Sequence, residues 1–188
     1  MKNIAISCAI LCALVFQSKA FSQRFDQVDK APVDIAYLRP NQKSKPLVKV
    51  VYGRPAIEKG KVFGSLVPYG EIWRTGANEA TEITFYKDML FGNKLVKQGT
   101  YVMHTIPGKK EWTIILNSNT DTWGAFFYNP EKDVARFKVK TKKDMRDPLD
   151  VFSIAFKKDF KDSYMVLAWE ETRVDIPLDD TSPMLAKI

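Results

Sequence analysis

The sequence has little of the chemistry on which metal centres and nucleophilic active sites depend. It contains two cysteines and one histidine in 188 residues, and both cysteines, Cys8 and Cys12, lie in the apolar N-terminal stretch described below. A single histidine without further thiols cannot supply the common zinc ligand sets or a cysteine nucleophile. No G-x-S-x-G elbow places a serine beside His104. The sequence therefore predicts neither a bound metal nor a cofactor.

Hydrophobic runs of membrane-spanning length are also missing. The longest apolar-rich run, Ile4–Phe16, follows Lys2 and is too short to cross a bilayer. Small residues then allow cleavage after Ala20 or Ser22, as signal peptidases require. We therefore predict a signal peptide over residues 1–22, export to the periplasm or beyond, and no membrane span. Cleavage removes both cysteines, so the mature chain is expected to have no disulfide.

The basic residues are not concentrated enough to form a surface that binds nucleic acid. The chain has 29 basic and 22 acidic residues, a net charge of +7, and without the two lysines of the signal peptide 27 basic residues remain against 22. The densest basic run, Lys138–Arg146, is interrupted by Asp144 and lacks the interleaved stacking aromatics that such surfaces use. Lysines in this pattern are typical of a protected strand edge. We expect no nucleic-acid partner.

No stretch long enough for a helix repeats its apolar residues with the helical period. Apolar and polar residues alternate instead. This period of two is the pattern of strands with one buried face. It recurs nine times, at residues 33–38, 47–52, 81–86, 101–106, 112–116, 135–139, 151–156, 164–169 and 172–176. The sequence therefore predicts an all-β fold: a single antiparallel β-sandwich or jelly-roll-like domain of about eight or nine strands.

Turn residues divide the predicted strands. Pro55 ends the strand at 47–52, because proline cannot donate to a central ladder, and residues 107–110 (PGKK) connect the clearest hairpin. A tight reversal is expected at residues 91–95. The predicted organisation is a signal peptide (1–22), a lead-in with one short strand (23–46), the sandwich domain (47–178) and a C-terminal tail (179–188).

The only histidine lies on a predicted strand. His104 is in phase with Val102 and Ile106, so it shares a sheet face with two apolar residues. A histidine in that setting is more often packed than catalytic, although its ordinary pKa suits general-base chemistry. It remains a partner for Glu79 in the enzymatic alternative below.

Residues 73–85 (WRTGANEATEITF) combine polar and charged residues immediately before a strand. Gly76 and Asn78 suit a turn, through backbone freedom and side-chain hydrogen bonding. Arg74 and Glu79 follow an aromatic-rich loop that could bury them, and buried charges must be paired or used. Either they form an ion pair that fastens the loop, or they offer a guanidinium and a carboxylate to a ligand beside aromatic walls.

Five segments of the chain carry a family resemblance: VVYGRP, KGKVFGSLVPYGEIWRTGANEATEITF, GTYVMHTIPGKKEWTIILN, DTWGAFFYN and WEETRVDIP. Together they resemble a family of exported bacterial proteins known as a domain of unknown function, the twenty-nine eleven family. The resemblance extends from about Leu47 to Pro177. It implies an exported all-β domain with no established activity, so it assigns no catalytic residue.

From these observations we expect a binding module for a small polar or anionic ligand, such as a glycan or a cell-envelope fragment. The expected ligand-binding residues are Arg54, Trp73, Arg74, Asn78, Glu79 and His104, with Trp123 as a further wall. One alternative is a metal-independent hydrolase or isomerase that uses Glu79 and His104. Another is a structural or interaction protein of the cell envelope. The oligomeric state is left open by the sequence.

Overall fold

The computed structural model describes residues 29–57, 60–120, 122–143, 147–159 and 162–180. The predicted signal peptide and most of the predicted tail lie outside these residues. Within them the chain forms eleven strands, one turn of 3-10 helix at Pro130–Lys132 and no α-helix. The predicted all-β class is confirmed.

All nine predicted strands are present, with ends that differ by a few residues, and two short strands join them. The strands are β1 (Val33–Leu38), β2 (Val48–Gly53), β3 (Thr81–Phe85), β4 (Met89–Phe91), β5 (Lys94–Val96), β6 (Gly99–Ile106), β7 (Glu111–Asn117), β8 (Asp133–Lys142), β9 (Leu149–Asp159), β10 (Asp162–Glu170) and β11 (Thr172–Asp180). The two additions, β4 and β5, flank the predicted reversal at residues 91–95 and pair with each other.

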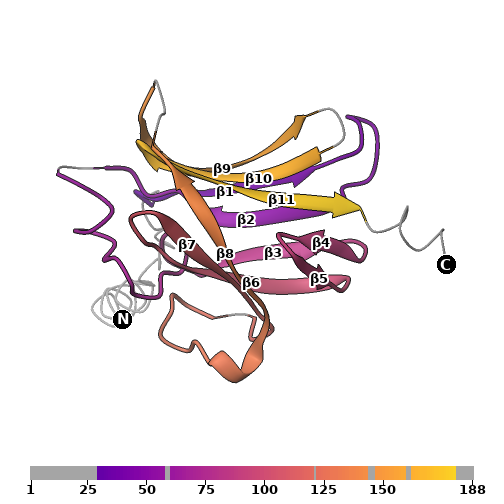
Figure 1. Ribbon diagram of the computed structural model, residues 1–188, viewed down its shortest axis with the longest axis horizontal. Coiled ribbons are helices and arrows are strands. Elements are labelled where there is room, and N and C mark those ends of the chain that lie inside the picture. The colour runs from indigo at the N-terminus through magenta and orange to yellow at the C-terminus, as the bar shows by residue number, and fades with distance from the viewer. Residues whose placement is uncertain (1–28, 58–59, 121, 144–146, 160–161, 181–188) are drawn as a thin grey trace, which may run out of the picture.

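The strands form one antiparallel sheet that folds back on itself. Its order is β1-β2-β3-β6-β7-β8-β11-β10-β9, and β4 adds to β11. The long strand β8 belongs to both halves: it pairs with β7 along most of its length and with β11 at Thr141 and Lys142. In Figure 1, β8 crosses from the layer of β9, β10 and β11 to the layer of β3 and β6. The predicted antiparallel all-β domain is confirmed, and it is built from a single folded sheet.

The two ends of the sheet also approach each other. Ala56, just beyond β2, forms a bridge with Val151 of β9, and Phe152 N donates to Pro55 O at 2.9 Å. The hydroxyl of Tyr52 accepts from Ile154 N at 3.0 Å. These contacts nearly close the sheet into a barrel.

Aromatic rings fill the core near this closure. The Trp73 ring lies 5.0 Å from Phe152, 6.1 Å from Trp112 and 6.1 Å from Trp169, with which it is stacked, and Phe63 contacts three of the four rings. Such rings remove large apolar areas from water and dominate core energetics. Trp73 is thus an anchor that places the residue after it, Arg74, at the boundary of the core.

Candidate functional site

The loop that carries Trp73 and Arg74 is held by an internal hydrogen-bond network. Trp73 exchanges two backbone hydrogen bonds with Thr105 of β6, and its Nε1 donates to Gly76 O at 3.1 Å. The hydroxyl of Thr81 donates to Thr75 O at 2.7 Å. These contacts fix the backbone on both sides of Arg74, so the position of its side chain is built into the fold.

Backbone strain in this loop falls on Thr75 and Asn78, whose φ angles are 59° and 61°. Gly76 does not have a positive φ; instead a Cβ at this position would lie 2.9 Å from Gly53 O. Its role is therefore to let the loop approach the end of β2, and not to supply the turn conformation considered from the sequence. Positive φ at a non-glycine residue costs about 1 kcal/mol or more and often marks a functional site.

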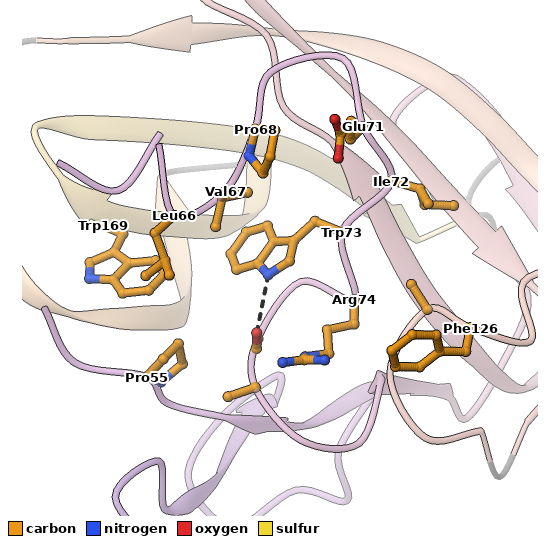
Figure 2. Close-up of a pocket in the computed structure, with 13 residues that line it drawn as sticks. Pro55, Leu66, Val67, Pro68, Glu71, Ile72, Trp73, Arg74, Phe126 and Trp169 are labelled. Atoms are coloured by element: carbon orange, nitrogen blue, oxygen red, sulfur yellow. Dashed lines mark hydrogen bonds between the residues drawn. The ribbon is translucent and has the colours of Figure 1, made fainter. Parts of the chain in front are cut away.

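A pocket of about 440 Å³ opens between this loop, the end of β2 and the connection from β7 to β8. Figure 2 shows its side chains. The walls are mostly apolar and include Pro55, Leu66, Trp73, Phe126 and Trp169. Apolar pockets with a few placed polar groups are the usual form of small-molecule sites.

Arg74 is the cation of this pocket. Its side chain is half-buried, and its Nε is fully buried without a hydrogen-bond partner. Among the described residues Arg74 forms no ion pair and no side-chain hydrogen bond, and its Cζ lies 6.0 Å from the centre of the Trp123 ring. In Figure 2 its guanidinium extends between Phe126 and Pro55. Because arginine keeps its charge, this fork of donors has unused capacity.

The carboxylates near Arg74 do not neutralise it. Glu71 lines the same pocket but is exposed and lies at the far end from Arg74 in Figure 2. Glu79 is exposed and lines a second pocket of about 500 Å³, together with Glu82 and Trp123. The ion pair between Arg74 and Glu79 that we considered from the sequence is therefore not formed.

Arg54 is another expected ligand-binding residue. Each of its three guanidinium nitrogens already has a partner within the fold. Its Nη1 forms an ion pair with Asp34 at 3.0 Å, its Nη2 donates to Ser153 Oγ at 2.9 Å, and its Nε donates to Phe152 O at 3.3 Å. This guanidinium fastens β1 and the end of β2 to β9. It does not line the pocket of Arg74.

Asn78 and His104 also lie away from the pocket. Asn78 donates from Nδ2 to Asp29 Oδ2 at 2.9 Å. His104 is 2% exposed and its ring meets the Tyr128 ring edge-on at 5.2 Å. Burial lowers the pKa of His104 to about 4, against the opposing effect of Asp133. It is therefore neutral near pH 7, and its buried Nδ1 has no hydrogen-bond partner.

The structure thus brings together two of the six expected residues, Trp73 and Arg74, and distributes the other four. No described contact joins Glu79 to His104, so the enzymatic alternative gains no geometric support. Two walls of the pocket, Phe126 and Trp169, were not anticipated. The cluster TWGAFF at residues 122–127, three aromatic residues without alternation, was the available signal for Phe126. Trp169 gave no signal beyond its place on a strand.

Two further facts concern the described residues. No group of three or more histidine, cysteine, aspartate or glutamate residues there is arranged to hold a metal ion. None of the helical structure in the described part of the chain is long and apolar enough to traverse a bilayer.

The fold and the pocket define an all-β protein with a partly enclosed, mainly apolar recess around one arginine. Over residues 36–178 the chain matches the family described as "Protein of unknown function (DUF2911)". It belongs to this family, in agreement with the resemblance seen in its sequence motifs. No curated protein and no solved structure matches the chain.

Proposed function

We propose that this protein is a binding module for a small anionic ligand, whose acid group is held by Arg74 in the pocket of about 440 Å³. The observation that carries the proposal is the half-buried guanidinium whose Nε is buried and unpartnered. A buried donor without an acceptor costs about 1–3 kcal/mol. A carboxylate or phosphate in the pocket offsets that cost through charge-assisted, bidentate hydrogen bonds to the accessible Nη atoms of the guanidinium.

The rest of the pocket sets the orientation of the ligand. Phe126 and the edge of Trp73 offer apolar contact for the body of the molecule. Glu71, at the end away from Arg74, repels a second acid group and accepts hydrogen bonds from hydroxyl or amine donors. The favoured ligand is therefore acidic at one end and carries donors at the other.

The place of action proposed here is the cell envelope or the exterior, on the strength of the predicted signal peptide at residues 1–22. Mass spectrometry of the protein purified from its host tests this: a mature N-terminus at Phe21 or Gln23 is expected. A chain that retains Met1 and its apolar segment contradicts it.

The binding proposal is tested by calorimetric titration of the mature protein with benzoate, D-glucuronate and inorganic phosphate. At least one is expected to bind, and Arg74→Met is expected to weaken that binding tenfold or more, the factor that about 1.4 kcal/mol represents. Arg39→Met is the matched control, because Arg39 also lies over an aromatic ring, Tyr37 at 4.7 Å, outside the pocket. Binding of no probe, or equal loss in both variants, contradicts the proposal.

A further inference from the structure

An exposed aromatic platform separates the two pockets. Trp123 lines the second pocket and Phe126 lines the first, and their rings are parallel within 4° at a centroid distance of 5.7 Å. Trp123 is 55% exposed and Phe126 is 76% exposed. We call these two rings the aromatic platform. Contiguous exposed apolar surface is typical of interaction sites.

The chain holds the platform in place from both sides. Ala80 N donates to Thr122 O at 3.2 Å, and Glu79 forms a bridge with Trp123. Gly124 has a φ of 68°, and a Cβ there would lie 3.3 Å from both the Arg74 Nη1 and the Phe126 ring. Glycine suits this position because its φ is left-handed, and a side chain here would press on both Arg74 and the Phe126 ring.

Polar groups of opposite character flank the platform. On the side of the first pocket lies the Arg74 guanidinium, 6.0 Å from the Trp123 ring. On the side of the second pocket lie the carboxylates of Glu79 and Glu82 and the hydroxyl of Thr122. A ligand that covers the whole surface must present an acid, then a flat apolar face, then hydrogen-bond donors.

We propose that the ligand is an acidic oligosaccharide that lies across the platform and reaches both pockets; this inference rests on the function proposed above. The carboxylate of one uronate-type sugar binds Arg74. The C–H face of a sugar ring packs on the platform, since the faces of aromatic rings are electron-rich. Hydroxyl groups of the next sugars donate to Glu79 and Glu82.

Other ligand classes fit this surface less well. The phosphates of a nucleic acid would be repelled by Glu79 and Glu82, since backbone charge dominates such binding. An anionic lipid surface would meet the same two carboxylates beside the rings. Sugar hydroxyls both donate and accept, so they suit a surface with a guanidinium at one end and carboxylates at the other.

The test is calorimetric titration of the mature protein with glucuronate and with the tetramer of the glucuronate-N-acetylglucosamine repeat, in which a neutral sugar follows each uronate. The tetramer is expected to bind ten times or more as tightly as glucuronate. Trp123→Ala is expected to remove that gain, because it deletes one ring of the platform, whereas Arg74→Met weakens the binding of both glucuronate and the tetramer. Phe127→Ala is the matched control, because Phe127 is 67% exposed in the same segment and lines neither pocket.

The outcomes separate this inference from the function on which it rests. If the tetramer binds no more tightly than glucuronate, or if Trp123→Ala and Phe127→Ala change tetramer binding equally, the proposed oligosaccharide ligand is wrong. Arg74-dependent binding of benzoate, phosphate or glucuronate would then still support the small-ligand pocket. If Trp123-dependent binding is seen only with phosphatidylglycerol vesicles, the surface takes lipid and the inference is overturned. If nothing binds through Arg74, both proposals fail.

Discussion

Arg54 and Arg74 are the same residue type, lie close together in the sequence and were both expected to bind a ligand, yet the fold treats them in opposite ways. Arg54 uses its Nε, Nη1 and Nη2 within the protein, on Phe152 O, Asp34 and Ser153. Arg74 has a buried Nε without a partner and no ion pair among the described residues. One guanidinium is therefore satisfied by folding, and the other has no ion pair or hydrogen-bond partner among the described residues.

The difference follows from what each arginine meets across the core. Arg54 comes at the end of β2, where the sheet approaches β9 and presents a carbonyl and a hydroxyl. Arg74 follows the inward anchor Trp73 and faces the mainly apolar walls of the pocket. Since arginine keeps its charge, burial without a partner is tolerated only where solvent or a ligand can reach the rest of the group. An unpaired charge is thus the feature that singles out the pocket, because the other two buried side-chain atoms without a partner in the described part of the chain, His104 Nδ1 and Trp112 Nε1, belong to uncharged groups.

The largest effect that we expect on stability comes from His104. Unlike the two arginines, this buried group can avoid an unpaired charge by remaining neutral. Its pKa in the folded protein is about 4, whereas an unfolded histidine titrates near 6.5. As the pH falls through this window, the unfolded chain binds a proton that the folded chain does not. Stability present above about pH 6.5 is therefore lost toward pH 4, by on the order of 3 kcal/mol.

Denaturant unfolding of wild type and His104→Phe between pH 7 and pH 4 measures this effect. The chain has one histidine, so the difference between the two pH profiles isolates it from the carboxylates, which titrate in both proteins. The charged and titratable groups near the ring are Asp133, Tyr128 and Arg136, which form one hydrogen-bonded cluster. Parallel profiles for the two proteins would show that His104 accepts its proton in the folded state as easily as in the unfolded one.

Arg54→Ala tests the satisfied side of the comparison. The change removes an ion pair and two hydrogen bonds that join β1 and β2 to β9. Since the Arg54 and Asp34 side chains are 35% and 43% exposed, solvent weakens the ion pair, and we expect a loss of about 2 kcal/mol. The melting temperature should fall by about 4–8 °C. Lys138→Ala, which breaks an exposed ion pair with Glu111, is the comparison. A shift in Arg54→Ala no larger than in Lys138→Ala would mean that the Arg54 contacts contribute little.

Two tyrosines give a matched comparison of smaller size. The hydroxyl of Tyr128 donates to Asp133 at 2.8 Å and accepts from Arg136 at 2.9 Å, whereas no hydrogen bond of the Tyr69 hydroxyl is found within the described residues. Tyr128→Phe is expected to cost about 1 kcal/mol and Tyr69→Phe only a few tenths. Chemical denaturation of both variants at pH 7 measures the difference, and equal costs would contradict the assigned role of the Tyr128 network.

Alternation along the sequence was sufficient to predict the strands but not how the sheet folds. The nine predicted strands are long enough for buried and exposed positions to repeat, as in β3 and β8. The strands β4 and β5 have three residues each, too few for a period to be seen. That β8 pairs with β7 and then with β11 depends on contacts between distant segments, which no local pattern encodes.

The site was predicted less completely than the fold, for the same reason. Local pattern indicated Trp73 and Arg74, because charge beside an aromatic residue before a strand is visible in a short window. Whether an arginine is satisfied depends on residues far along the chain: Arg54 finds its partners at Phe152 and Ser153. Glu79 and His104 could be named from their chemistry, but their separation could be learned only from the packed structure.

Arg74→Met is expected to have the smallest effect on folding, and this sharpens the contrast with Arg54 most directly. The substitution keeps much of the apolar contact of the side chain and removes a buried Nε that has no partner. The free energy of unfolding should change by less than about 0.5 kcal/mol, because the relief of the unpartnered Nε is offset by the loss of the guanidinium's contact with the Trp123 ring. Denaturant unfolding beside Arg54→Met checks it under one protocol. A loss in Arg74→Met as large as that in Arg54→Met would mean that folding itself uses the Arg74 guanidinium, and the argument for a ligand would lose its foundation.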